Sequence, residues 1–538
     1  MTILVSACLP ALAQQMPDTP LLQENARPLP RPAANGAPVV QLAAPTQAAQ
    51  GGAQVTLRRI EFLGNDHVSS QALLAALGPV EGKSYDFAGL TALATRLNLW
   101  YQQAGYPFAR AYLAQQDLSD GVLKIKIFEG RYGQVVAHGE PDFVPGAQGF
   151  LAALPKGALI ENGGLERVTL LLDDQPGMRT TPLVRPGQEI GTGDLLVEVQ
   201  RDHRYKGEAG LDNFGTRATG RTRAHVSADA DSPFMMGDQV SFQALYTDQH
   251  MWFGSLAYNA PLGHDGLRGK ASYTHSYYAL GDSFAALGAS GTADVASLGL
   301  SYPLVRSQMR NLIVSASVDH KRLHDRQAAT DSGSDKSSTV VPVNLSFDVR
   351  DQFIYAGITY GALSWVRGQL DLDAASQAID SGSAHSAGSF SKINFDLARI
   401  QSLSKQVDLY ARVSVQWADT NLDPSEKLGL GGVNGVRAYP NGEGYGDSGW
   451  LAQGELRYTM GSLAPFLFYD AGRVTLQKTP WMDATNHRSI AGAGLGVRYG
   501  GEHWSASLVA AWRTRGGAPQ SDSARGTPSV LGNATYRF

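Results

Sequence analysis

The chain has 538 residues and a formal net charge of −4, so it holds more than one small domain and is not a strongly basic nucleic-acid binder. Only 17% of the residues are charged, below the roughly 25% of soluble proteins. No run of about 18 apolar residues occurs, which excludes a membrane-spanning helix but not a β-barrel, whose strands alternate.

Residues 1–13 are predicted to be a signal peptide, because a short apolar run ends in the small residues of Ala-Leu-Ala at 11–13. The usual basic amino-terminal region is missing, as it would be if the true start lay upstream. Residues 5–8 also fit a lipoprotein box, although the apolar run before them is short. Cleavage after Ala13 would remove Cys8, the only cysteine. The mature chain could then form no disulfide, no thiolate zinc site and no catalytic cysteine.

Residues 14–54 are rich in Pro and Ala and predict a linker without a core of its own. Thr19 followed by Pro20 fits the start of a short helix that reaches Asn25. This helix is a candidate plug for a pore.

Residues 55–130 predict a small α+β unit in the order strand, helix, helix, strand, strand. The strands are expected at 57–62, 108–114 and 122–129, and the helices at 70–77 and 87–104. The same order returns over 131–203. Its strands are expected at 132–139, 178–185 and 194–201, and its helices at 146–154 and 165–173. Two units with one element order indicate a repeat.

From Tyr205 the helical period disappears, and sixteen alternating segments follow. In 341–349 every odd position is apolar, while the even positions are Pro, Asn, Ser and Asp. A soluble β-sandwich would have to bury sixteen such apolar faces, and a soluble chain of that size usually divides into several domains. A closed barrel turns them toward lipid and leaves no free edge. The predicted fold is mainly β: a 16-stranded antiparallel transmembrane β-barrel over 204–538, preceded by two small α+β domains.

The longest connection with distinctive residues, 425–450, lies between the eleventh and twelfth predicted strands. Its motif Val436-Arg437-Ala438-Tyr439, with Gly431-Gly432 before it and Gly446-Asp447 after it, resembles the long sixth loop of the BamA-like outer-membrane transporter superfamily. Within that superfamily it resembles the two-partner secretion transporters (TpsB; ShlB/FhaC/HecB-like). The superfamily motif is Val-Arg-Gly-Tyr/Phe, so Ala438 is a departure. A methyl group there requires a backbone angle that is open to residues other than glycine.

The resemblance implies that Arg437 meets an acidic residue on the inner wall of the barrel. Phe468, Asp470 and Gly472 match the wall motif Phe-x-Asp-x-Gly on the thirteenth predicted strand. Alternation independently turns these three side chains inward, and Glu455 on the twelfth strand shares that phase. A guanidinium can clamp carboxylates in a fork. We therefore expect Arg437 to pair with Asp470, with Glu455 as a second carboxylate.

The two α+β units resemble POTRA domains, POTRA 1 over 55–130 and POTRA 2 over 131–203, so the resemblance covers residues 55–538. It rests on Gly105-Tyr106-Pro107-Phe108, on Phe128-Glu129-Gly130, and on Asp212-Asn213-Phe214-Gly215 at the barrel start. It implies that periplasmic POTRA domains receive an unfolded, TpsA-like exoprotein with a secretion domain, by strand addition at a sheet edge. The barrel would carry this haemolysin- or adhesin-type partner to the cell surface. The alternative is that the units only gate or brace the barrel.

Tyr536 and Phe538 share one face of the last predicted strand. This aromatic pair resembles the signal by which the barrel-assembly machinery recognises its clients, which would make that machinery and outer-membrane lipid further partners. The alternative is a plain last strand.

Two other functions stay open. A barrel-assembly factor of the same superfamily would usually carry more than two POTRA units, and a porin would carry none. An outer-membrane enzyme is disfavoured because the histidines occur singly and suggest no catalytic triad. The resemblance implies no catalytic residue, metal, cofactor or nucleic-acid partner.

Overall fold

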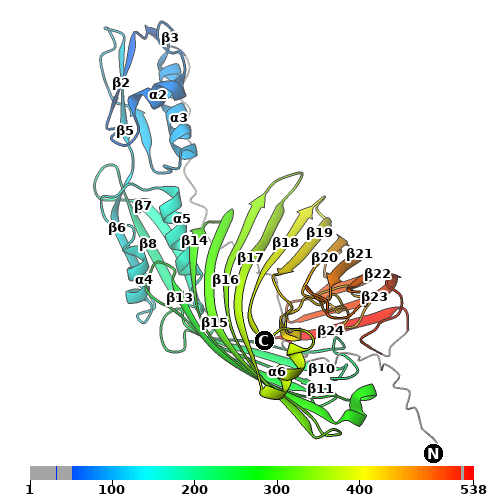
Figure 1. Ribbon diagram of the computed structural model, residues 1–538. Helices are drawn as coiled ribbons and strands as arrows, with labels where there is room; N and C mark the ends of the chain where they lie inside the picture. The colour runs from blue at the N-terminus through cyan, green and yellow to red at the C-terminus, as the bar shows by residue number, and fades with distance from the viewer. Residues whose placement is uncertain (1–31, 33–50, 52, 523–525) are drawn as a thin grey trace, which may run out of the picture.

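The computed structural model describes residues 32, 51, 53–522 and 526–538, which form two small α+β units followed by a barrel (Figure 1). The signal peptide expected at 1–13 and the helix expected at 20–25 lie outside the described residues. Within the described part of the chain, no helix is long and apolar enough to cross a membrane.

The first unit packs two helices against a three-stranded sheet in the order β2-β5-β4. Its elements are β1 (Val55–Thr56), β2 (Arg59–Leu63), α2 (Ser70–Leu77), β3 (Ser84–Tyr85), α3 (Phe87–Gln103), β4 (Arg110–Leu113) and β5 (Val122–Phe128). Ser69 and Asp86 begin the two helices by accepting hydrogen bonds from the N–H groups of Ala72 and Gly89. The separate ladder of β1 and β3 was not predicted, because two-residue strands show no alternation.

The second unit repeats this topology, with its sheet in the order β6-β8-β7. Its elements are β6 (Arg131–Gly139), α4 (Val144–Leu151), α5 (Asn162–Asp173), β7 (Met178–Pro186) and β8 (Thr192–Arg201). In both units the first long strand runs parallel to the central strand and the third runs antiparallel to it. The helix expected at 146–154 begins earlier, at Val144, because Pro145 lies in the first turn, where its missing N–H leaves no hydrogen bond unmade.

Sixteen antiparallel strands close into a barrel, as predicted. They are β9 (Tyr205–Asp212), β10 (Arg223–Asp231), β11 (Gln239–Thr247), β12 (Trp252–Pro261), β13 (Arg268–Ala279), β14 (Ala289–Arg306), β15 (Arg310–Gln327), β16 (Ser332–Asp351), β17 (Gly357–Leu372), β18 (Gly388–Ser402), β19 (Val407–Ala418), β20 (Ser448–Tyr458), β21 (Leu463–Thr475), β22 (His487–Gly500), β23 (Trp504–Arg515) and β24 (Ser529–Arg537). The barrel closes where residues 533–537 of β24 pair with residues 208–212 of β9.

The outer face of the barrel is apolar and the inner face is largely polar. On β21, Leu467 and Tyr469 point outward and are 59% and 54% exposed, whereas Phe466, Phe468 and Asp470 point inward and are buried. Large outward-facing aliphatic side chains that are similarly exposed include Leu298, Leu363, Leu409, Leu495 and Leu508. A barrel with this outer surface and no free edge satisfies its backbone hydrogen bonds within lipid.

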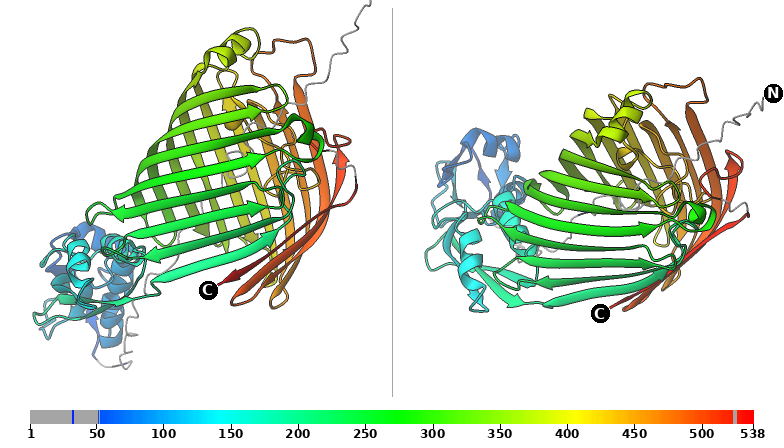
Figure 2. Two further views of the ribbon diagram at one scale, coloured as in Figure 1. Left: turned by 90° about the horizontal axis from the view of Figure 1, so that it is seen from below. Right: turned by 60° about the horizontal axis from the view of Figure 1, so that its bottom comes forward.

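The second unit rests on the turns at one end of the barrel, beside β13 to β15, while the first unit stands farther out (Figures 1 and 2). Asp174, which follows α5, accepts two hydrogen bonds of 2.7 Å from Arg306 of β14. Gln175 accepts a bond of 2.9 Å from Arg268 of β13. These contacts join the second unit to the barrel. The helix α6 (Ala374–Ser381) lies at the opposite end (Figure 2).

Candidate functional site in the barrel lumen

The connection between β19 and β20 folds back into the barrel. It spans 419–447 and not 425–450 as predicted, because β19 already ends at Ala418 and β20 begins at Ser448. A short antiparallel bridge between Leu428 and Gly446 closes its tip. The tip is buried in a hydrophobic cluster with Phe466 and Phe468 of β21. The motif predicted at 436–439 therefore lies inside the barrel, against its inner wall.

Arg437 is 4% exposed and is clamped by two carboxylates of the wall. Its Nε and Nη2 each donate to Asp470 over 2.8 Å, and its Nη1 donates to Glu455 over 2.5 Å. Its backbone N–H also donates to Asp470 over 3.2 Å. The sequence predicted both partners. Because Asp470 lies on β21 and Glu455 on β20, one guanidinium joins the loop to two adjacent strands.

Glu455 has two further cationic partners that the sequence reasoning did not identify. Arg457, also on β20, donates to it over 2.7 Å, and Arg498 of β22 donates through two nitrogens over 3.0 Å each. The cluster thus holds three guanidinium groups and two carboxylates. Arg457 shares the inward phase of Glu455 and could have been found from alternation. Arg498 could not, because its position depends on the register of β21 against β22.

The ring of Phe468 forms the floor under Arg437. The guanidinium carbon lies 3.6 Å from the ring centroid, a cation–π contact away from bulk water. Removal of Arg437 leaves the fully buried Asp470 without its guanidinium, and breaking a buried ion pair in this way costs about 3–5 kcal/mol. The geometry therefore fixes the loop tip against the inner wall.

Glycines on the inner face of β22 make room for the loop and for the aromatic floor. A Cβ atom on Gly492 would lie 2.5 Å from the Cβ of Ala438, and one on Gly494 would lie 2.5 Å from the ring of Phe468. The methyl group of Ala438, the departure from the superfamily motif, thus occupies space that Gly492 leaves free. The backbone of Ala438 does not adopt a positive φ, so the alanine is not strained there.

The remaining loop residues of the motif and the wall glycine are also placed at this site. Val436 is fully buried, and its N–H donates to the carbonyl of Leu430 over 2.7 Å. The hydroxyl of Tyr439 donates to the carbonyls of Arg515 and Gly517. A Cβ on Gly472 would lie 2.7 Å from the side chain of Leu430, so this wall glycine gives space to the loop.

Tyr536 and Phe538 lie apart from this site, on the outer face of the barrel. Their rings stack at a centroid distance of 6.3 Å, and the ring of Tyr536 lies 5.1 Å from that of Trp504. The backbone of Phe538 exchanges two hydrogen bonds of 3.0 Å with Gly207 of β9. Within the described residues, no group of three or more His, Cys, Asp or Glu side chains is arranged to hold a metal ion.

Comparisons with known proteins match two parts of the chain to families. Residues 191–499 match the family described as haemolysin secretion/activation protein ShlB/FhaC/HecB. Residues 55–130 match the POTRA domain of ShlB type.

Individual proteins resemble most of the chain. The heme/hemopexin transporter protein HuxB of Haemophilus influenzae is 24% identical over 437 residues, which cover 78% of this chain and 76% of that protein. The hemolysin transporter protein ShlB of Serratia marcescens is 26% identical and covers 80% of this chain and 76% of its own length. The structure of CdiB from Escherichia coli shares the fold, with a TM-score of 0.73, 20% identity and 94% coverage of both chains.

Proposed function

The chain belongs to the haemolysin secretion/activation protein family ShlB/FhaC/HecB, and from that premise we propose that Arg437 is the releasable lock of its transport pore. Members of this family are two-partner secretion transporters. The chain is accordingly an outer-membrane transporter that carries an exoprotein to the cell surface, with POTRA domains in the periplasm.

One observation carries the proposed lock: the guanidinium of Arg437 holds a loop inside the lumen through Asp470 and Glu455. A polypeptide that crosses the barrel needs the space that the loop tip fills. The ion pairs of Arg437 can be replaced by hydrogen bonds to a polar polypeptide or to water.

We propose further that the partner, an unfolded TpsA-like exoprotein with a secretion domain, adds a strand to a free sheet edge of the POTRA domains. The edge strands are β2 and β4 in the first unit and β6 and β7 in the second. β7 is a poor acceptor, because Pro182 interrupts its row of N–H donors. Three edges without a proline remain, β2 and β4 in the first unit and β6 in the second. We propose that the first unit, which offers two of them, receives the partner, with main-chain hydrogen bonds supplying affinity.

The lock is tested with Arg437→Ala in a strain that also expresses the exoprotein. We expect secretion per folded barrel to fall by at least about tenfold, since the loop loses its fixed position. Secretion per folded barrel should fall less in Arg437→Lys, because lysine keeps the positive charge but cannot bind a carboxylate through two nitrogens. Arg326→Ala, at an exposed arginine of β15, serves as the control.

Folded barrel is counted by its heat-modifiable mobility in outer-membrane fractions. A loss of secretion in Arg437→Ala that matches the loss of folded barrel would show that Arg437 serves folding and would refute the lock.

A further inference from the structure

The base of the loop, residues 421–427, is held by a second set of buried contacts, separate from the Arg437 cluster. It includes the short 3-10 helix η2 (Pro424–Glu426), which Asp423 caps by accepting a hydrogen bond from the N–H of Ser425. The base precedes the bridge of Leu428 with Gly446, so that bridge separates it from the tip.

Glu426 is clamped between two lysines of the inner wall. Its carboxylate lies 2.5 Å from Nζ of Lys321 on β15 and 2.7 Å from Nζ of Lys392 on β18. Lys392 also donates to the backbone carbonyl of Glu426 over 2.7 Å. The side chains of all three residues are at most 16% exposed. These three side chains form a buried ion cluster, and neither β15 nor β18 contributes a residue to the hydrophobic cluster around the tip.

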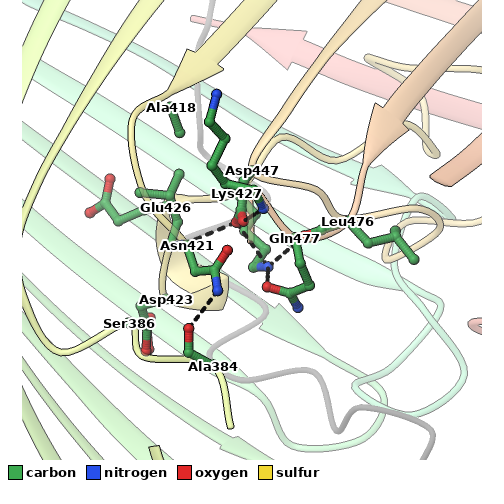
Figure 3. Close-up of polar contacts among 12 residues, drawn as sticks. Ala384, Ser386, Ala418, Asn421, Asp423, Glu426, Lys427, Asp447, Leu476 and Gln477 are labelled. Atoms are coloured by element: carbon green, nitrogen blue, oxygen red, sulfur yellow. Dashed lines mark hydrogen bonds and ion pairs between the residues drawn. The ribbon is translucent and has the colours of Figure 1, made fainter. Parts of the chain in front are cut away.

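Asp447 ties the same base to the connection between β21 and β22, and Asn421 ties it both to that connection and to the one between β17 and β18. Asp447, which is fully buried, pairs with Lys427 over 2.9 Å and accepts from the N–H groups of Leu422 and Lys478. Figure 3 shows Asn421 reaching the carbonyl of Ala384, with Lys427 lying between Asp447, Leu476 and Gln477. These bonds keep the base in place without any contribution from Arg437.

The two sets of contacts reach different strands. The tip binds β20 to β23, whereas Glu426 binds β15 and β18, and the rest of the base reaches the connection between β21 and β22. Along the shorter way round the barrel, the six strands β16 to β21 separate β15 from β22. The base of the loop is therefore anchored over a wider arc of the barrel wall than the tip.

A cavity of about 400 Å³ adjoins Glu426 on the β15–β18 side. Its lining mixes apolar and polar side chains, and the polar ones include Asn344, Ser364 and Asn394. Amide and hydroxyl groups of this kind can exchange hydrogen bonds with an extended backbone without holding it firmly. The base of the loop stands at the margin of this polar surface.

We infer that residues 421–427 are a second lock of the loop, held by Glu426 on the β15–β18 wall and opened separately from Arg437. Opening it gives the exported chain access to the polar wall. Glu426 is thus a positioning residue for transport. This inference rests on the proposed function of the loop as the lock of a pore.

The test measures how often each part of the loop opens. In the full-length protein with Cys8→Ser, one reporter cysteine is introduced by Ser425→Cys in the base or by Val433→Cys in the tip. The rate of labelling by a membrane-impermeant maleimide in outer-membrane fractions follows the open population of each segment. Each reporter is combined with Glu426→Gln, Glu426→Asp or Arg437→Ala, and secretion is measured in parallel.

We expect Glu426→Gln to raise labelling of the base reporter by about tenfold, because the two lysines lose their shared carboxylate. Labelling of the tip reporter should change less than twofold. Arg437→Ala should do the reverse. Glu426→Asp should restore slow labelling in part. Asp483→Asn, which removes one negative charge from an exposed site between β21 and β22, should change neither reporter.

If Glu426→Gln accelerates both reporters equally, the loop has one lock and the inference fails, while the role of Arg437 stands. If neither Glu426→Gln nor Arg437→Ala changes secretion, the proposed function of the loop fails as well. Should Glu426→Gln not fold, Lys321→Gln/Glu426→Gln removes one charge of each sign and keeps the net charge. Labelling of the base reporter in that variant at the parental rate also overturns the inference.

Discussion

At the residue scale, the two carboxylates around Arg437 depend on it unequally. Glu455 keeps Arg457 and Arg498 when Arg437 is removed, whereas Asp470 loses a guanidinium that supplies two of its hydrogen bonds. In the opposite case, Arg437 still has Glu455 when Asp470 is removed. We therefore expect Arg437→Ala to impair transport more than Asp470→Ala.

Coupling between the two residues follows from the same geometry. The double variant Arg437→Ala/Asp470→Ala leaves neither an unpaired guanidinium nor an unpaired carboxylate. Its loss of secretion per folded barrel should therefore be smaller than the product of the two single losses, by a coupling of at least about 1 kcal/mol. A double loss equal to that product would show that the two side chains act independently.

At the scale of single strands, β22 determines how closely the loop tip can approach. Gly492→Val should push the tip away from the wall, because Ala438 occupies the space that the new side chain needs. We expect faster labelling of the Val433→Cys reporter and lower secretion without any change of charge. Gly500→Val on the same strand has no atom within 4 Å of its new Cβ and is the matched control. Equal effects of the two variants would contradict a specific role for Gly492.

The edge where β24 meets β9 carries an aromatic side chain that we propose to serve insertion by the barrel-assembly machinery. Phe538 is 64% exposed on the outer face and packs over Gly207. Phe538→Asp should lower the amount of folded barrel, since charge is unfavourable at a lipid interface that aromatic rings favour. Secretion per folded barrel should stay within about twofold, and Phe538→Leu should be milder. Normal barrel levels with failed secretion would assign Phe538 to transport instead.

At the scale of the whole molecule, the two POTRA domains differ in their attachment. We expect deletion of residues 55–130 to leave a folded barrel that no longer secretes, because the favoured receiving edges are lost. Deletion of 55–201 also removes Asp174, and the buried Arg306 loses its carboxylate. That step should cost about 3 kcal/mol and reduce the amount of folded barrel.

Heat-modifiable mobility and secretion separate these two effects. Asp174→Asn in the full-length chain is the matched control, because it removes only the charge that faces Arg306. Continued secretion by the shorter deletion would disprove reception by the first unit. Unchanged amounts of folded barrel in the longer deletion would show that the second unit does not brace the barrel.

The sequence by itself determined the kind of fold and the central pair of the site. Alternation with period two is a local property, so it could be read from segments such as 341–349 without knowledge of their neighbours. A closed sheet with its apolar face in lipid pairs the backbone groups of sixteen such segments and leaves no free edge. Arg437 and Asp470 were found because both lie in short motifs that resemble those of a known transporter family, and alternation independently turns Asp470 inward.

Only the tertiary structure decided what surrounds that pair. The contacts of Arg498 with Glu455 and of Gly492 with Ala438 depend on the register of β22, which no single segment specifies. The clamp of Lys321 and Lys392 on Glu426 joins residues about 30 to 100 positions apart, and it exists because the loop folds back inside the barrel. Local patterns determine which way a side chain faces. Which side chain it meets depends on how the barrel closes and where the loop enters it.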